Sequence, residues 1–106
     1  MTYKVTYKVN PSKKVVKLNI SNKHQKYTLL ICNTKYNMLK SVINNDNQKY
    51  DDFVLCEDYI MILNDYEHCI TDPDDINDII KKLKLVLKEL ECHFCLNSVF
   101  YHDYNL

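Results

Sequence analysis

The chain has 106 residues, of which 46% are hydrophobic and 26% are charged, and its 14 basic residues balance 14 acidic ones. This length suits one compact domain with one modest core, so we expect a single domain over residues 1–106. Gly and Arg are both absent, which excludes glycine-rich phosphate-binding loops and the bidentate clamps that Arg forms with phosphate or carboxylate.

The first third of the chain predicts three strands. Apolar and polar residues alternate over residues 3–9 and 16–20, which is typical of half-buried strands, and residues 10–12 supply a turn between them. Residues 27–32 are apolar on both faces, as in a central strand. We therefore expect an antiparallel meander.

A short helix and a hairpin follow. Thr34 has the side chain of an N-cap, and apolar residues recur at helical spacing over residues 35–44. Residues 53–56 and 59–63 are β-rich runs separated by two acidic residues, which indicates a hairpin.

The clearest local signal is the start of a long helix. Asp72 can cap it, Pro73 has the fixed φ of a first helical position, and Asp74 and Asp75 complement the positive end of the helix dipole. One apolar stripe with spacings of three and four then runs from residue 76 to residue 90.

Together these elements predict an α+β fold in the order βββαββα. We expect one twisted antiparallel sheet of about five strands, covered by one short and one long amphipathic helix. Residues 99–101 are a candidate for a last edge strand or an ordered tail.

Charge is separated along the chain. Residues 1–50 contain ten Lys and one acid, whereas residues 51–106 contain four Lys and thirteen acids. Ten of those acids lie in residues 51–78, which contain no Lys. Such asymmetry indicates charged partners, although the same charges can also pair across the two halves of the fold.

The cysteines are candidate metal ligands. Cys92 and Cys95 have C-x-x-C spacing, and His68 and Cys69 would complete a tetrahedral zinc site. The predicted long helix separates the two pairs by nearly 30 Å, roughly 1.5 Å for each residue, so one ion cannot bridge them. A zinc site would need other ligands: Cys32, Cys56 or His102.

No catalytic constellation is evident. Cys92 and His93 are neighbours whose side chains would point in different directions on a helix, and capping accounts for the acids of residues 72–75. We therefore expect no enzymatic activity, no catalytic or metal-binding residues and no cofactor.

The favoured function is inhibition through a protein interface. Carboxylates on the hairpin can occupy the basic groove in which a nucleic-acid enzyme holds phosphate, and tyrosines are favoured at interfaces. The predicted partner-binding residues are Asp51, Asp52, Glu57, Asp58, Tyr59, Asp65, Tyr66 and Glu67.

The chain also has general features of known inhibitors. Its size, segregated charge and lack of catalytic motifs are similar to those of small phage anti-defence proteins, including anti-CRISPR proteins, and of toxin-immunity proteins. Gly, Ala and Arg, which GC-rich codons encode, are absent, which favours an AT-rich source such as a phage, a virus or an AT-rich bacterium. We expect a viral counter-defence protein that binds a host effector such as a CRISPR nuclease complex, with a toxin-immunity protein as an alternative.

A second alternative is a single-stranded nucleic-acid-binding module. Lysines and tyrosines interleave on the predicted sheet, and together they can contact phosphates and stack on bases. The predicted nucleic-acid-binding residues are Lys4, Lys8, Lys13, Lys14 and Lys17. Strand alternation argues against stacking, because Tyr3 and Tyr7 point inward if the lysines face solvent.

The predicted location is the cytoplasm of the host cell. No apolar run approaches the roughly 20 residues that span a bilayer, and the N-terminus lacks the continuous apolar region of a secretory signal.

Overall fold

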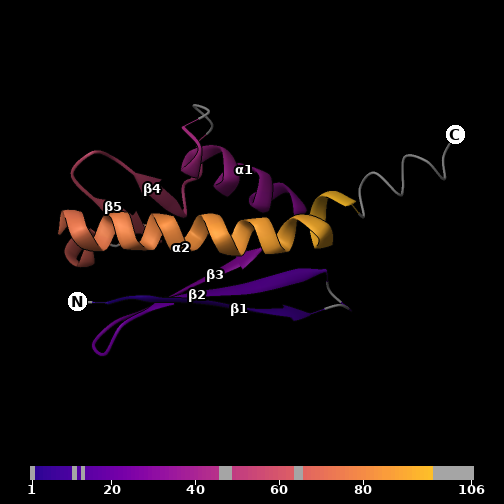
Figure 1. Ribbon diagram of the computed structural model, residues 1–106, viewed down its shortest axis with the longest axis horizontal. Helices are drawn as coiled ribbons and strands as arrows, with labels where there is room; N and C mark the ends of the chain where they lie inside the picture. The colour runs from indigo at the N-terminus through magenta and orange to yellow at the C-terminus, as the bar shows by residue number, and fades with distance from the viewer. Residues whose placement is uncertain (1, 11, 13, 46–48, 64–65, 97–106) are drawn as a thin grey trace, which may run out of the picture.

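A computed structural model describes residues 2–10, 12, 14–45, 49–63 and 66–96 of the chain. The fold is α+β, and it contains two α-helices and two antiparallel sheets (Figure 1). In chain order its elements are β1 (Lys4–Asn10), β2 (Val15–Ser21), β3 (Lys26–Ile31), α1 (Asn33–Ile43), β4 (Phe53–Leu55), β5 (Ile60–Ile62), the 3-10 turn η1 (Tyr66–His68), α2 (Pro73–Glu91) and the π-helical turn η2 (Cys92–Leu96). The predicted strand between residues 99 and 101 lies outside the described residues.

The first three strands form the predicted antiparallel meander, in the spatial order β1-β2-β3. Val16 of β2 lies between Val9 and Ile31, and Ile20 lies between Val5 and Tyr27. The expectation that residues 27–32 form a central strand is wrong, because β2 is central and β3 is an edge. The outward Leu30, which made β3 look apolar on both faces, is 59% exposed.

The expectation of one five-stranded sheet is not confirmed. β4 and β5 pair only with each other, from Phe53 opposite Ile62 to Leu55 opposite Ile60. Ile60 also bridges Ile70 on its other side, so this small sheet extends toward α2 and not toward β3. The chain turns into α1 directly after β3, and α1 contacts both β3 and β4, which explains why the two sheets remain separate.

α1 begins earlier than its composition predicts. Its N-cap is Cys32 and not Thr34, and the Cys32 carbonyl accepts a hydrogen bond from the Tyr36 amide at 2.8 Å. No side chain caps this end. The helix therefore follows the strand with a single residue between them.

α2 matches its prediction closely. Asp72 is the N-cap, Pro73 is the first residue, and the Asp72 carboxylate accepts hydrogen bonds from the amides of Asp74 at 2.8 Å and Asp75 at 3.3 Å. The buried positions of this helix all belong to the predicted stripe, and they are Ile76, Ile79, Leu83, Val86, Leu87 and Leu90. Ile80, the remaining residue of that stripe, is partly buried and packs against the core.

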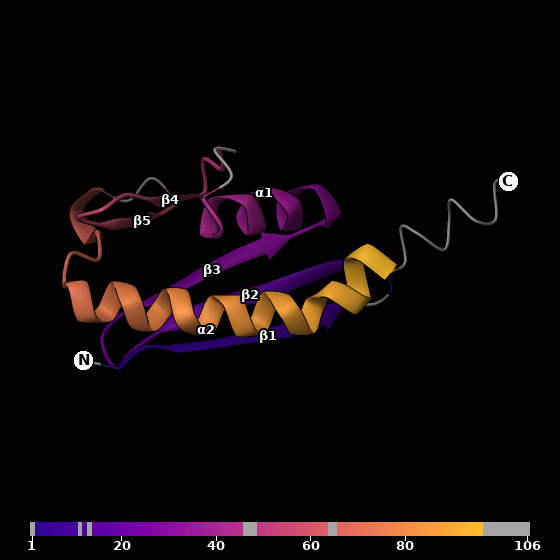
Figure 2. The ribbon, with the colours of Figure 1, turned by 45° about the horizontal axis from the view of Figure 1, so that its top comes forward.

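The core lies between the three-stranded sheet and the helices. α2 runs along β1 and β2, while α1 and the β4–β5 hairpin lie on the same side of the sheet (Figure 2). The sheet buries its inner side chains against these elements: Val16, Leu18, Ile20, Tyr27, Leu29 and Ile31. Neither helix covers the other side of the sheet, which faces solvent (Figure 1). Within the described ranges no helix is long and apolar enough to cross a membrane.

Candidate functional site

The uncovered side of the sheet carries lysines and small polar residues. Strand register brings together every second residue of β1, β2 and β3 on this side, because successive side chains alternate between faces. We call this surface the lysine face. It consists of Lys4, Thr6, Lys8, Asn10, Val15, Lys17, Asn19, Ser21, Lys26, Thr28 and Leu30.

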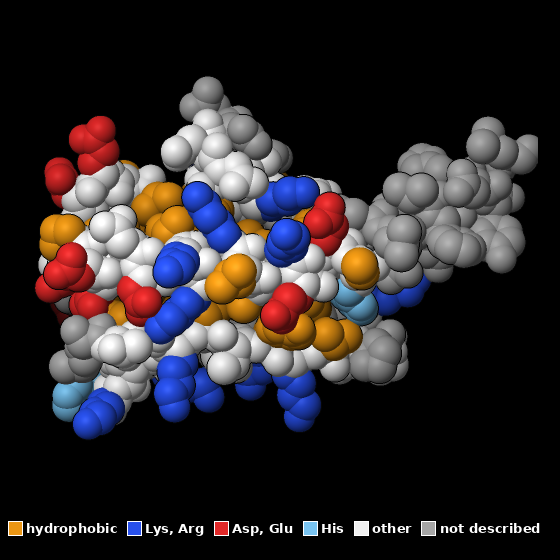
Figure 3. Space-filling model, in the orientation of Figure 1, with side chains coloured by type: hydrophobic (Ala, Val, Ile, Leu, Met, Phe, Trp, Pro, Cys, Tyr) orange, Lys and Arg blue, Asp and Glu red, His pale blue; other side chains and the backbone are white. Residues whose placement is uncertain are grey.

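No acidic residue belongs to the lysine face. Lys8 lies directly opposite Lys17 across the β1–β2 ladder, an arrangement that repels. Among the described residues, neither of these lysines forms an ion pair, and both are exposed. Figure 3 views the sheet from its side and shows lysines projecting from the lower margin of the molecule. The face therefore presents positive charge that the fold does not neutralise locally.

Three of the five predicted nucleic-acid-binding lysines lie on this face. Lys4, Lys8 and Lys17 lie on it, whereas Lys14 is exposed in the β1–β2 turn with a φ of 52°. Lys13 lies outside the described residues. Lys26 of β3 was missing from the predicted set, although alternation in β3 would have placed it on the outer face.

The tyrosines of the basic half point away from the lysine face, as strand alternation predicts. Tyr3 is 4% exposed, and burial, followed by the nearby Asp75 carboxylate, raises the pKa of its hydroxyl. Tyr7 lies on the inner side of β1, but it is 37% exposed and donates a hydrogen bond to Glu89 of α2 at 2.9 Å. That hydrogen bond raises the pKa of Tyr7. Tyr27 is buried and donates to the His68 carbonyl at 2.7 Å. The lysine face thus has no aromatic platform for stacking bases.

One end of the lysine face is hollowed. A cavity of about 770 Å³ lies beside the β2–β3 loop. Its lining residues are Thr2, Lys4, Ser21, Asn22, Lys23 and His24. We call this cavity the basic hollow. Lys4 and Ser21 are register partners on the lysine face, so the hollow adjoins one end of that face.

Hydrogen bonds hold both walls of the basic hollow in place. In the β2–β3 loop, the Asn22 carbonyl oxygen Oδ1 accepts hydrogen bonds from the amides of His24 and Gln25, each at 2.8 Å. On the β1 side, the backbone between the lining residues Thr2 and Lys4 is held by the Lys82 ammonium of α2, which donates to the Tyr3 carbonyl and to Asp78. The hydrogen bond from Lys82 holds the pKa of the Asp78 carboxyl below its usual value.

The predicted partner-binding residues that the structure describes do not form one continuous patch. Asp51 and Asp52 precede β4, whereas Glu57 and Asp58 follow it, so the two pairs lie at opposite ends of the hairpin. The Asp52 carboxylate is 3.6 Å from the Lys35 ammonium of α1. The remaining predicted residues are a half-buried Tyr59, an exposed Glu67, and Asp65 and the Tyr66 side chain, which both lie outside what the structure describes.

A smaller group of acids does gather. The Ile60–Ile70 bridge is antiparallel, so residues just before Ile60 lie beside residues just after Ile70. This brings the turn of the hairpin next to the start of α2, where Figure 3 shows acidic side chains at the left of the molecule. We call this region the acidic end. Its exposed members are Glu57, Asp58, Asp72 and Asp74.

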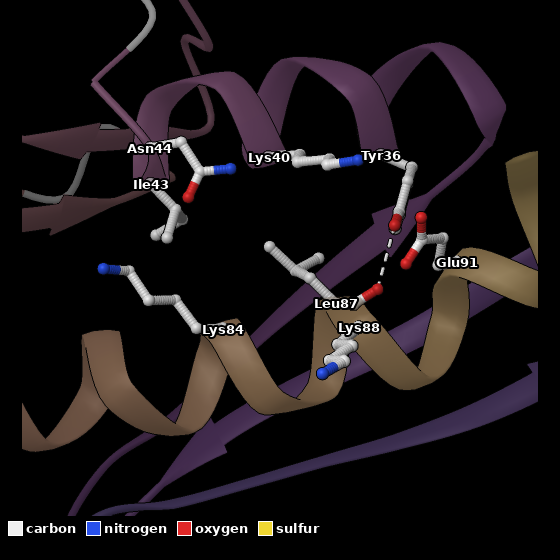
Figure 4. Close-up of a pocket in the computed structure, with 8 residues that line it drawn as sticks. All are labelled: Tyr36, Lys40, Ile43, Asn44, Lys84, Leu87, Lys88 and Glu91. Carbon is white, nitrogen blue, oxygen red and sulfur yellow. Dashed lines mark hydrogen bonds between the residues drawn. The ribbon is translucent and has the colours of Figure 1, made fainter.

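Sequence reasoning did not foresee a second basic region, a groove of about 270 Å³ between α1 and α2 (Figure 4). Its wall includes Tyr36, whose hydroxyl donates to the Leu87 carbonyl at 2.9 Å. Lys40, Lys84 and Lys88 surround it, but Figure 4 shows their ammonium groups well apart and pointing in different directions. The groove does not concentrate charge on one ligand position.

The structure does not bring His68 and Cys69 close to Cys92, as a shared zinc site would require. His68 and Cys69 precede α2, and Cys92 follows it, so about 28 Å of helix separates them. In the described part of the chain no three His, Cys, Asp or Glu side chains group closely enough to hold a metal ion.

Comparison with known proteins identifies no relative whose surfaces could be compared with these. No family model, curated protein or solved structure matches this chain, so its function is inferred from its own residues.

Proposed function

We propose that this protein is a non-catalytic nucleic-acid-binding protein whose lysine face holds the phosphate backbone without reading the base sequence. The observation that carries the proposal is the outward row of lysines on a sheet side where the described residues supply no acid and no covering element. Phosphate contacts by lysine supply most of the affinity in non-specific binding. Without outward aromatic rings the face gains little from unstacked bases, so we expect duplexes to bind at least as tightly as single strands.

A purely structural role explains only part of this arrangement. Lysines on an edge strand deter pairing with other chains, which accounts for Lys4 and Lys8 on β1. Lys17 lies on the central strand, where no edge needs protection, and its repulsion with Lys8 opposes folding. A like-charged pair retained at some cost to stability favours a role in binding.

The test is binding of a fluorescent 20-base-pair duplex at several salt concentrations, measured by anisotropy. If Lys4, Lys8, Lys17 and Lys26 each contact a phosphate, the plot of log K against log salt has a slope of about −3.6. The double variant Lys8→Gln with Lys17→Gln should make the plot less steep, with a slope of about −1.8. It should also weaken binding by roughly tenfold or more at 0.1 M salt.

The matched control is Lys84→Gln with Lys88→Gln, which removes the same charge from the α1–α2 groove. It should leave the slope unchanged. Equal losses of duplex affinity in both double variants would mean that net charge alone drives binding. An unchanged salt slope in the Lys8→Gln with Lys17→Gln variant would overturn the proposal.

A second candidate function is inhibition of a nucleic-acid-processing effector by the acidic end. The observation that favours it is the juxtaposition of exposed acids from the hairpin turn and the start of α2, because such a group can occupy a basic nucleic-acid channel. Under this proposal the protein is a counter-defence inhibitor of the anti-CRISPR kind, with a CRISPR nuclease complex as its partner.

Cleavage of target DNA by purified CRISPR nuclease complexes tests the second candidate. Wild-type protein should block cleavage, and Glu57→Lys with Asp58→Lys should not. Asp51→Lys is a suitable control, because this exposed acid lies at the other end of the hairpin. Full inhibition by the double variant would eliminate the acidic end as the inhibitory surface.

A further inference from the structure

The basic hollow differs from the rest of the lysine face in depth and chemistry. Its lining combines two lysines and one histidine with the hydroxyls of Thr2 and Ser21, and it includes no acid. Among the described residues, neither Lys4 nor Lys23 forms an ion pair. Cationic and hydroxyl donors around one cavity are suited to an oxyanion with several acceptor oxygens.

The geometry of the Asn22 loop leaves these donors available. The Oδ1 atom of Asn22 is occupied by two backbone amides, so its remaining polar group toward a ligand is the NH₂ donor. The His24 amide is used inside the loop, and His24 itself is an exposed residue that lines the cavity. Several donors are therefore present around the hollow, together with hydroxyls that can donate or accept, and the Asn22 acceptor of the loop is already satisfied.

We propose that the basic hollow binds a phosphomonoester, specifically the terminal phosphate of a nucleic-acid strand that lies on the lysine face. This inference rests on the proposed nucleic-acid-binding function. A terminal phosphate has a second pKa near 6 and carries a charge of roughly −1.5 to −2 at pH 7, compared with one charge on a backbone phosphate. Because Lys4 and Ser21 belong to both the hollow and the lysine face, a bound end continues directly into a bound backbone.

The experiment compares 20-nucleotide single strands that differ only at their ends: a 5′-phosphate, a 3′-phosphate, or hydroxyls at both ends. We expect at least about fivefold tighter binding of one phosphorylated strand than of the hydroxyl-ended strand, consistent with one added charge-assisted contact. Lys23→Gln with His24→Gln should abolish this preference and leave the affinity for the hydroxyl-ended strand unchanged. Lys8→Gln with Lys17→Gln should weaken binding of all three strands and keep the preference.

The outcomes separate the two proposals. Equal affinity of wild-type protein for all three strands, with dependence on Lys8 and Lys17 retained, would overturn the role of the hollow and leave the lysine face intact. Absence of binding to any strand or duplex would overturn the proposed function itself. Adenosine monophosphate and inorganic phosphate serve as competitors. If either binds as tightly as the phosphorylated strand, the ligand is a free phosphate compound and the assignment to a strand end is wrong.

Discussion

Left-handed backbone at bulky residues is the main residue-level consequence of a chain without glycine. Lys14, Asn45 and Leu63 have φ angles of 52°, 60° and 61°. This region costs an ordinary residue roughly 1 kcal/mol or more, whereas Asn tolerates it through local hydrogen bonding. Leu63 is the least suited of the three, and its position after β5 is fixed by a 2.8 Å hydrogen bond from its amide to the Asp52 carbonyl.

We therefore expect Leu63→Asn to stabilise the protein by about 0.5–1 kcal/mol in urea denaturation, because Asn relieves the backbone cost and Leu63 is already 50% exposed. Leu85→Asn is the matched control, since Leu85 is 59% exposed within α2. That substitution should destabilise by a few tenths of a kcal/mol through lower helix propensity. If both substitutions destabilise equally, the side chain of Leu63 contributes more than its backbone costs.

At the scale of elements, the start of α2 is predictable because every local signal agrees. Cap, proline, acidic first turn and apolar stripe all lie within one stretch of sequence, and the helix begins where they indicate. The start of α1 is not predictable in this way, because its N-cap residue, Cys32, makes no side-chain capping hydrogen bond and so leaves no signature in the sequence. Pairing of β4 and β5 away from the first sheet depends on contacts that are distant in sequence, which alternation cannot reveal.

The two helix starts provide a direct comparison. Asp72→Ala removes the acceptor of two amide hydrogen bonds, and it should lower the free energy of unfolding by about 1 kcal/mol. Thr34→Ala should change it by no more than about 0.5 kcal/mol, because Thr34 is an exposed residue inside α1 and does not cap it. Thermal denaturation of both variants at one pH measures the difference. A larger loss for Thr34→Ala would contradict the assignment of Cys32 as the cap.

In the candidate site, too, local sequence patterns predict some features, whereas contacts between residues distant in sequence are not predictable from them. Alternation along β1 and β2 predicts that Lys4, Lys8 and Lys17 share a face, and they do. Alternation along β3 also predicts the outer face for Lys26, but its position beside Ser21 requires the β2–β3 register, and the basic hollow requires the conformation of the loop between those strands. Both arise from tertiary structure and have no motif in the sequence.

For the molecule as a whole, the main feature is that a lysine-rich surface and an acid-rich end are separate, whereas basic and acidic side chains are mixed over the helices (Figure 3). The lysine face lies on one side of the sheet, and the acidic end lies where the β4–β5 turn meets the start of α2 (Figure 3). The acidic end lies near the end of the sheet where β1 begins, because Lys82 of α2 donates a hydrogen bond to the Tyr3 carbonyl, but it is on the opposite side of the sheet from the lysine face (Figure 1). Packed layers lie roughly 10 Å apart, which is well within the Debye length of about 30 Å in 0.01 M salt and slightly above the value of about 8 Å in 0.15 M salt. The acids therefore oppose binding of nucleic acid mainly when salt is low.

This argument predicts that Glu57→Lys with Asp58→Lys tightens duplex binding several-fold at 0.01 M salt and has little effect at 0.15 M salt. The measurement is duplex anisotropy for wild-type and variant protein across that range. A gain in duplex affinity that persists at 0.15 M salt would place the acidic end in contact with the nucleic acid, because screening by salt removes only the repulsion between distant acids and phosphates. If the same variant also loses inhibition of a nuclease complex, the acidic end and the lysine face serve separate partners, and the separation of charge is what allows one small domain to bind both.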